Sequence, residues 1–126
     1  MKVYVVGNPL VEADSLPLRL LPKLKKAFPQ IVFEEADPNE NFIPEEGSII
    51  IDTVEGIKDV RWFNSIDDFV TTKSVSPHDY DLGFHLRMLL KLHKISKVKI
   101  LGVAADISLN KIIQVIREHF LGSSNI

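Results

Sequence analysis

The sequence contains no cysteine among its 126 residues, and this limits the chemistry available to the chain. Without cysteine there can be no disulfide framework, no thiolate nucleophile, and no zinc or iron–sulfur centre held by sulfur ligands. A metal site in this chain would therefore depend on carboxylate oxygens and imidazole nitrogens.

Long apolar runs are also missing. No stretch approaches the roughly 20 residues that a membrane-spanning helix requires. A strand is predicted to begin at residue 2, which leaves no room for a secretory signal peptide. We therefore expect a cytoplasmic protein that does not insert into a membrane.

The chain has little net charge, with a formal value of −2 at pH 7. Its one basic cluster, Lys23-Leu24-Lys25-Lys26, is typical of a solvated helix face, so nucleic acid is not an expected partner. The 45% hydrophobic and 25% charged residues indicate an ordinary globular protein. The length predicts a single domain over residues 1–126.

Motifs of several enzyme classes are absent. No serine lies in a Gly-x-Ser-x-Gly elbow, so a serine-triad hydrolase is not expected. Gly7 opens a predicted strand-to-helix turn, but the sequence has neither the Gly-x-Gly-x-x-Gly fingerprint nor a Walker loop. Nucleotide binding is therefore not predicted.

Apolar and β-branched runs predict strands, and residues at helical spacing predict helices between them. The Ile-rich strand has the continuous apolar character of a strand buried on both faces, whereas two glutamates place the second strand near a sheet edge. The predicted strands are 2–6, 31–36, 48–52 and 98–103, with 58–64 as a candidate antiparallel edge strand. The predicted helices are capped by Asp14 or Ser15, by Asp79 or Asp81, and by Ser108.

Proline, serine and glycine residues predict where two of these helices bend, begin or end. Pro22 lies inside the first one, where it removes a hydrogen bond at a cost of roughly 3 kcal/mol, so we expect a kink or a late start. Ser108 is the expected cap of the last helix, and Gly122 its expected end. The alternation of strands and helices predicts an α/β fold, a three-layer α/β/α sandwich with a mostly parallel sheet.

Three metal-capable side chains lie near the predicted carboxyl ends of strands or at the starts of helices, namely Asp14, Asp52 and His78. Ligands of open α/β sheets bind outside the carboxyl ends of the strands. Two carboxylates and an imidazole suit nickel, zinc or a similar divalent ion. Taken alone, Asp14 is equally explained as a helix cap and Asp52 as a turn former.

His78 follows Pro77, which restricts the backbone of Ser76 and favours a defined direction for the imidazole. A structural histidine is the alternative interpretation. His85, His93 and His119 lie within predicted helices and have no metal-ligand partner four residues on, so they receive no function and are expected to be solvent-facing or half-buried.

The chain resembles the hydrogenase maturation endopeptidases, which trim the C-terminal extension from the large subunit of nickel–iron hydrogenases. The matching segments are Gly7-Asn8-Pro9-Leu10 with Ala13-Asp14, Ile49-Ile50-Ile51-Asp52, Ser76-Pro77-His78 and Ile100-Leu101-Gly102-Val103. The resemblance implies that Asp14, Asp52 and His78 are catalytic and metal-contacting, and that Asn8 and Asp37 contact the substrate.

Two positions depart from the family pattern. The family's Asp-Gly-Gly-Thr-like loop, implicated in substrate choice, corresponds here to Asp37-Pro38-Asn39-Glu40, and Ala13 replaces the first residue of an acidic pair. Glycine permits backbone shapes closed to proline and asparagine, so this loop must have a different conformation.

The resemblance implies an endopeptidase whose nickel belongs to the precursor, so no tightly held cofactor is expected. The implied partner is the nickel–iron hydrogenase large-subunit precursor, and the protein is expected to be a monomer. Two alternatives remain open: a catalytically silent relative that binds a metalloprotein precursor, and a small α/β ligand-binding domain in which Asp14 and Asp52 are only caps.

Overall fold

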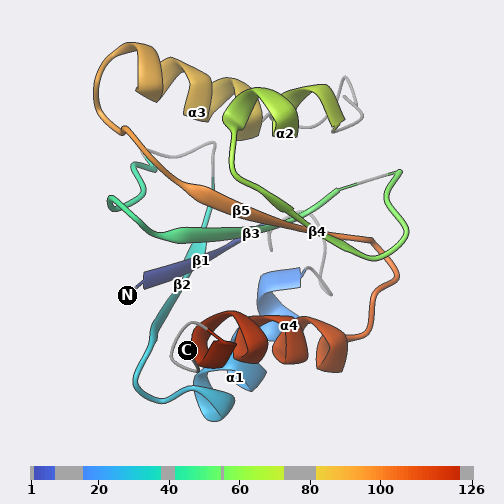
Figure 1. Ribbon diagram of the computed structural model, residues 1–126. Coiled ribbons are helices and arrows are strands. Elements are labelled where there is room, and N and C mark those ends of the chain that lie inside the picture. Colours follow the sequence, from blue (N-terminus) through green and yellow to red (C-terminus); the bar gives the residue numbers. More distant parts are fainter. Residues whose placement is uncertain (1, 8–15, 38–41, 55, 73–81, 123–126) are drawn as a thin grey trace.

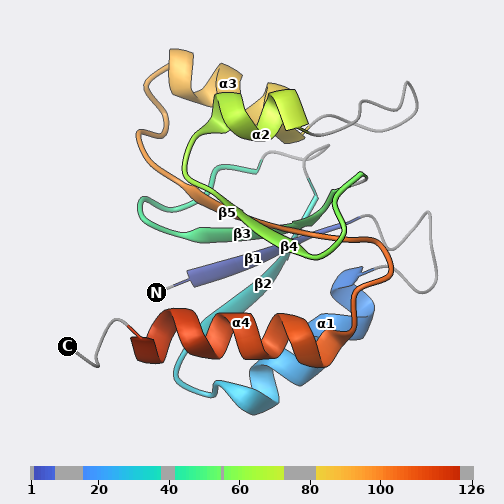
Figure 2. The same ribbon diagram turned by 45° about the vertical axis from the view of Figure 1, so that its right-hand side comes forward.

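The computed structural model describes residues 2–7, 16–37, 42–54, 56–72 and 82–122. These residues form one five-stranded sheet with helices on both faces (Figures 1 and 2). The strand order is β2-β1-β3-β5-β4, and the bounds are β1 Lys2–Val6, β2 Val32–Ala36, β3 Ile49–Thr53, β4 Val60–Phe63 and β5 Lys99–Val103. The predicted three-layer α/β/α architecture is confirmed.

Two helices cover each face of the sheet (Figures 1 and 2). On one face lie α1 (Leu16–Ala27) and α4 (Leu109–Gly122), which contact each other. On the other lie α2 (Ile66–Thr72) and α3 (Leu82–Lys91), which also contact each other. Within the described residues, no helix combines the length and apolarity needed to cross a membrane.

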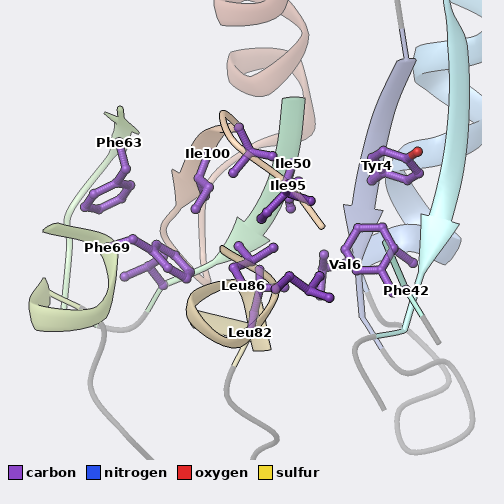
Figure 3. Packing of buried hydrophobic residues seen from close by; sticks show 14 residues of the cluster. Tyr4, Val6, Phe42, Ile50, Phe63, Phe69, Leu82, Leu86, Ile95 and Ile100 are labelled. Carbon is purple, nitrogen blue, oxygen red and sulfur yellow. The ribbon is translucent and has the colours of Figure 1, made fainter. Parts of the chain in front are cut away.

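The Ile-rich strand β3 lies in the middle of the sheet, as predicted. Ile50 packs into the apolar cluster beneath α2 and α3, whereas Ile49 and Ile51 pack into the cluster beneath α1 and α4. Successive side chains of a strand point to opposite faces, so a strand buried on both faces must be apolar at every position. Figure 3 shows Ile50 among the residues of the first cluster.

Both edges of the sheet are as the sequence predicted. β2 pairs only with β1 among the described strands, and its Glu34 and Glu35 are exposed. β4 pairs antiparallel with β5 at the other edge. Charged side chains on an edge strand discourage pairing with a further chain.

Helix α1 runs from Leu16 to Ala27 with Pro22 inside it, so the expected late start is wrong. Pro22 is exposed, as is Leu18, whose carbonyl has lost its helical donor. Water can bond that carbonyl on the solvent side, which allows the helix to continue.

The helix ends follow local capping chemistry. The hydroxyl of Ser108 accepts a hydrogen bond from the backbone N–H of Lys111 at 3.2 Å, which confirms the predicted cap of α4. That helix ends at Gly122, as predicted. In α2, a helix that the sequence analysis missed, Ser65 caps the N–H of Asp68 in the same way.

Candidate functional site

The sheet has a topological switch point between β1 and β3. From β1 the chain crosses one face through α1 to reach β2. From β3 it continues through the edge strand β4 and then over the other face, through α2 and α3, to reach β5 (Figure 1). The two connections therefore diverge at the carboxyl ends of β1 and β3. In open α/β sheets this divergence leaves a crevice where ligands bind.

Asp52 lies at the carboxyl end of β3, beside this switch point. Only 6% of its surface is exposed. Its neighbour on β5 is Gly102, and both residues lie on the α2 and α3 side of the sheet by their alternation with Ile50 and Ile100. A carboxylate this deeply buried needs polar partners, and Asp52 does make such an interaction.

Gly7 follows β1 at the same edge. Its N–H donates to the carbonyl oxygen of Ala36 at 3.2 Å, which extends the pairing of β1 with β2. A Cβ added to Gly7 would lie 2.5 Å from Cδ of Pro17 in the first turn of α1. Glycine is therefore required for α1 to approach the strand this closely.

The structure places one further predicted residue at this edge. Asp37 directly follows β2, is half-buried and has an interaction partner. Asn8, Asp14 and His78 lie outside the described residues. Along the chain, Asp14 precedes the first residue of α1 by two positions, and His78 precedes the first residue of α3 by four.

Among the residues that the structure describes, no group of three or more histidine, aspartate or glutamate side chains could hold a metal ion. Asp52 is the one member of the predicted triad within that part of the chain. It could supply a single carboxylate ligand, and the other two ligands of the predicted site fall outside this set.

His85 is buried, with 7% of its surface exposed, so the expectation of a solvent-facing or half-buried side chain is wrong. Its Nε2 lies 2.6 Å from the carbonyl oxygen of Phe42, and the two rings stack. A carbonyl only accepts hydrogen bonds, so Nε2 must carry the proton. His85 lies at helical spacing from Leu82, Leu86 and Leu89, on the same face of α3, and this pattern was the signal for its burial.

Two side chains away from this edge have displaced pKa values. A hydrogen bond to Glu34 raises the pKa of Lys2 at the start of β1. Burial, and after it the charge of Lys99, lowers the pKa of His119, which packs against Trp62 of β4 with ring centres 4.7 Å apart. The first displacement comes from a side-chain ion pair at the edge of the sheet, and the second from the packing of α4 beside β4.

Comparison with solved structures shows what this chain is similar to. The hydrogenase maturating endopeptidase HybD from E. coli superposes with a TM-score of 0.60, over 98% of this chain and 91% of that one, at 18% sequence identity. The chain has the fold of a hydrogenase maturation endopeptidase. No protein-family model matches the sequence, and no curated protein matches it either.

The similarity to this endopeptidase fold confirms at the level of fold the resemblance carried by the four sequence segments. In this chain, Gly7, Asp37 and Asp52 lie at the carboxyl edge of the sheet, each at or next to the end of a parallel strand. Fold does not by itself determine activity, so the chemistry must be argued from these residues.

Proposed function

We propose that the protein is a metal-dependent endopeptidase that removes the C-terminal extension of a nickel–iron hydrogenase large-subunit precursor after nickel insertion. The observation that carries the proposal is the position of Asp52, a buried carboxylate at the switch point of a sheet whose fold is that of an endopeptidase. Ligands of open α/β sheets bind at this place, and a carboxylate there can serve as a metal ligand or as a general base.

In this proposal the nickel ion is part of the substrate. Asp14, Asp52 and His78 would supply ligands to an ion that the precursor brings with it. Gripped between the two proteins, the ion would position the scissile peptide and polarise its carbonyl or a water molecule. In the alternative mechanism, one of the two carboxylates acts directly as the general base.

Chain connectivity supports this grouping. Asp14 lies seven residues after Gly7 and two before Leu16 in the sequence, and both of those described residues lie at the carboxyl edge or beside it. His78 lies within four residues of Leu82, a reach of at most roughly 14 Å. Leu82 packs in the same apolar cluster as Val6, the last residue of β1.

The test is to incubate the protein with a nickel-loaded precursor and follow loss of its C-terminal peptide by mass spectrometry. We expect His78→Ala and Asp52→Asn each to lower the rate at least roughly 100-fold. Matched controls are His93→Asn and Asp106→Asn, which change exposed residues of the same types and should cleave normally. Undiminished cleavage by His78→Ala would remove the metal-site interpretation.

The second candidate function is a catalytically silent relative that binds the precursor without cutting it. The sequence Asp37-Pro38-Asn39-Glu40 favours it, because both glycines of the family's substrate-selecting loop are missing. Tight binding of the nickel-loaded precursor with its C-terminal peptide still attached would support this function over proteolysis.

A further inference from the structure

The outer face of α3 carries a line of exposed apolar side chains. Phe84 is 63% exposed and Met88 is 41% exposed, one helical turn apart, and Leu92 follows just beyond the helix end at 58%. Residues four apart lie on the same side of a helix. We call Phe84, Met88 and Leu92 the α3 stripe. Single exposed apolar residues are ordinary, but three in line mark an interaction surface.

A cationic line runs beside the α3 stripe. Arg87 lies three residues after Phe84, and Lys91 lies three residues after Met88. The guanidinium of Arg87 forms an exposed ion pair with Asp67 of α2, at 2.9 Å. Residues 82–105 contain no aspartate or glutamate, although the whole chain has a net charge of −2; the basic residues there are Arg87, Lys91, Lys94, Lys97 and Lys99.

The α3 stripe begins close to the candidate site. At the start of α3, Leu82 and Leu86 pack in one cluster with Val6 at the carboxyl end of β1 (Figure 3). His85 contacts the carbonyl of Phe42, in the segment that follows β2. Phe84 therefore lies on the helix turn that is nearest to the carboxyl edge of the sheet.

We propose that the α3 stripe docks the folded body of the protein substrate, through an apolar ridge on that substrate flanked by carboxylates. The inference rests on the proposed function, because it concerns the same precursor. A peptidase that cuts one protein at one bond gains selectivity from contacts remote from that bond. Asp67 neutralises Arg87, but the exposed Lys91 and Lys94 remain as cations that favour an acidic surface over a basic one.

Other occupants fit the same residues less well. A helix that lies in a membrane surface has one broad, continuous apolar face, whereas on α3 the exposed Leu90 is separated from the α3 stripe by Arg87 and Lys91. A second copy pairing antiparallel across α3 would bring the Arg87 and Lys91 side chains of both copies together, which is repulsive.

The experiment measures binding and cleavage separately. The dissociation constant for nickel-loaded precursor is measured by biolayer interferometry, and KM and kcat are measured by release of the C-terminal peptide. We expect Phe84→Ser/Met88→Ser to raise both Kd and KM about tenfold and to leave kcat within twofold. Lys91→Glu should raise Kd several-fold and reduce its dependence on salt concentration.

The control is Leu121→Ser on α4, which changes a side chain 56% exposed on the opposite face of the sheet. It should bind and cleave as the wild type does. Thermal unfolding followed by circular dichroism must show all variants folded, and because the substituted side chains are exposed, we expect little change in the unfolding temperature.

The outcomes distinguish this inference from the proposed function. Cleavage by the wild type with unchanged Kd in Phe84→Ser/Met88→Ser overturns the docking surface and leaves the peptidase standing. If the wild type binds the precursor without cleaving it, and the substitutions weaken that binding, the result supports docking and removes proteolysis. Association with anionic vesicles but not with precursor, or a wild-type dimer that the double substitution dissociates, overturns the inference in favour of those occupants.

Discussion

The imidazole Nε2 of His85 lies 2.6 Å from the backbone carbonyl oxygen of Phe42, and this contact joins α3 to the segment that follows β2. The two residues are 43 positions apart in the chain. Both are buried, so neither group can exchange its partner for water. The contact fixes the start of α3 relative to the carboxyl edge of the sheet.

Replacing His85 by phenylalanine should keep the ring but remove the donor. The carbonyl of Phe42 would then be buried without its partner, so we expect the free energy of unfolding to fall by about 1–3 kcal/mol. Urea denaturation at pH 7 measures the change. Stability equal to that of the wild type would show that the carbonyl finds another donor.

Replacing Gly7 by alanine should force β1 and α1 apart. The new Cβ would lie 2.5 Å from Cδ of Pro17, a rigid ring that cannot rotate away. We expect a loss of about 1–3 kcal/mol in the free energy of unfolding. Pro17→Ala in the same chain should recover part of that loss, and a fully additive double-mutant cycle would contradict the clash.

Replacing His93 by glycine should stabilise the protein. His93 has a positive φ of 58°, and its N–H and that of Lys94 donate to the carbonyls of Leu90 and Leu89 in a Schellman ending of α3. A histidine in this left-handed conformation costs roughly 1–2 kcal/mol, a cost that glycine avoids. The midpoint temperature of thermal unfolding should rise for His93→Gly and should rise less for His93→Asn.

Acidification should destabilise the fold through His119. Its pKa is lowered by burial, so the unfolded chain takes up a proton at pH values near 6.5 where the folded protein does not. The free energy of unfolding of the wild type should therefore fall relative to that of His119→Gln as the pH falls through 6.5 towards the pKa of His119 in the folded protein. Urea unfolding at several pH values measures this difference.

The same titration has an optical readout. Trp62 is the single tryptophan of the chain, and its ring lies 4.7 Å from that of His119. Protonation of the imidazole should change the fluorescence of Trp62, with a midpoint below 6.5 in the folded protein. A midpoint at or above 6.5 would contradict the displaced pKa.

Local patterns in the sequence predicted most of the fold. The apolar run of β3, the glutamates of β2 and the imperfect alternation of β4 correctly placed a central strand and two edges. Helix α2 was missed because its seven residues include β-branched Val70, Thr71 and Thr72, although Ser65 and the acidic first turn were a capping signal.

Long-range contacts were less predictable. Helical spacing with Leu82 and Leu86 places His85 on the buried face of α3, but its hydrogen-bond partner, the carbonyl of Phe42, comes from a distant segment that no local pattern identifies. The position of Asp52 near the carboxyl end of a central strand followed from the Ile-rich run before it, because a continuous apolar run is typical of a strand buried on both faces. Asp14 and His78 lie outside the described residues, so their place beside Asp52 stays a prediction.

The strand that carries Asp52 packs against both helical layers, through Ile50 on one face and through Ile49 and Ile51 on the other. A carboxylate mounted on such a strand has no independent hinge, because it can move only when both layers loosen together. Displacement of Asp52 and thermal unfolding of this protein should therefore coincide, with no range of temperature in which a folded chain holds a displaced aspartate.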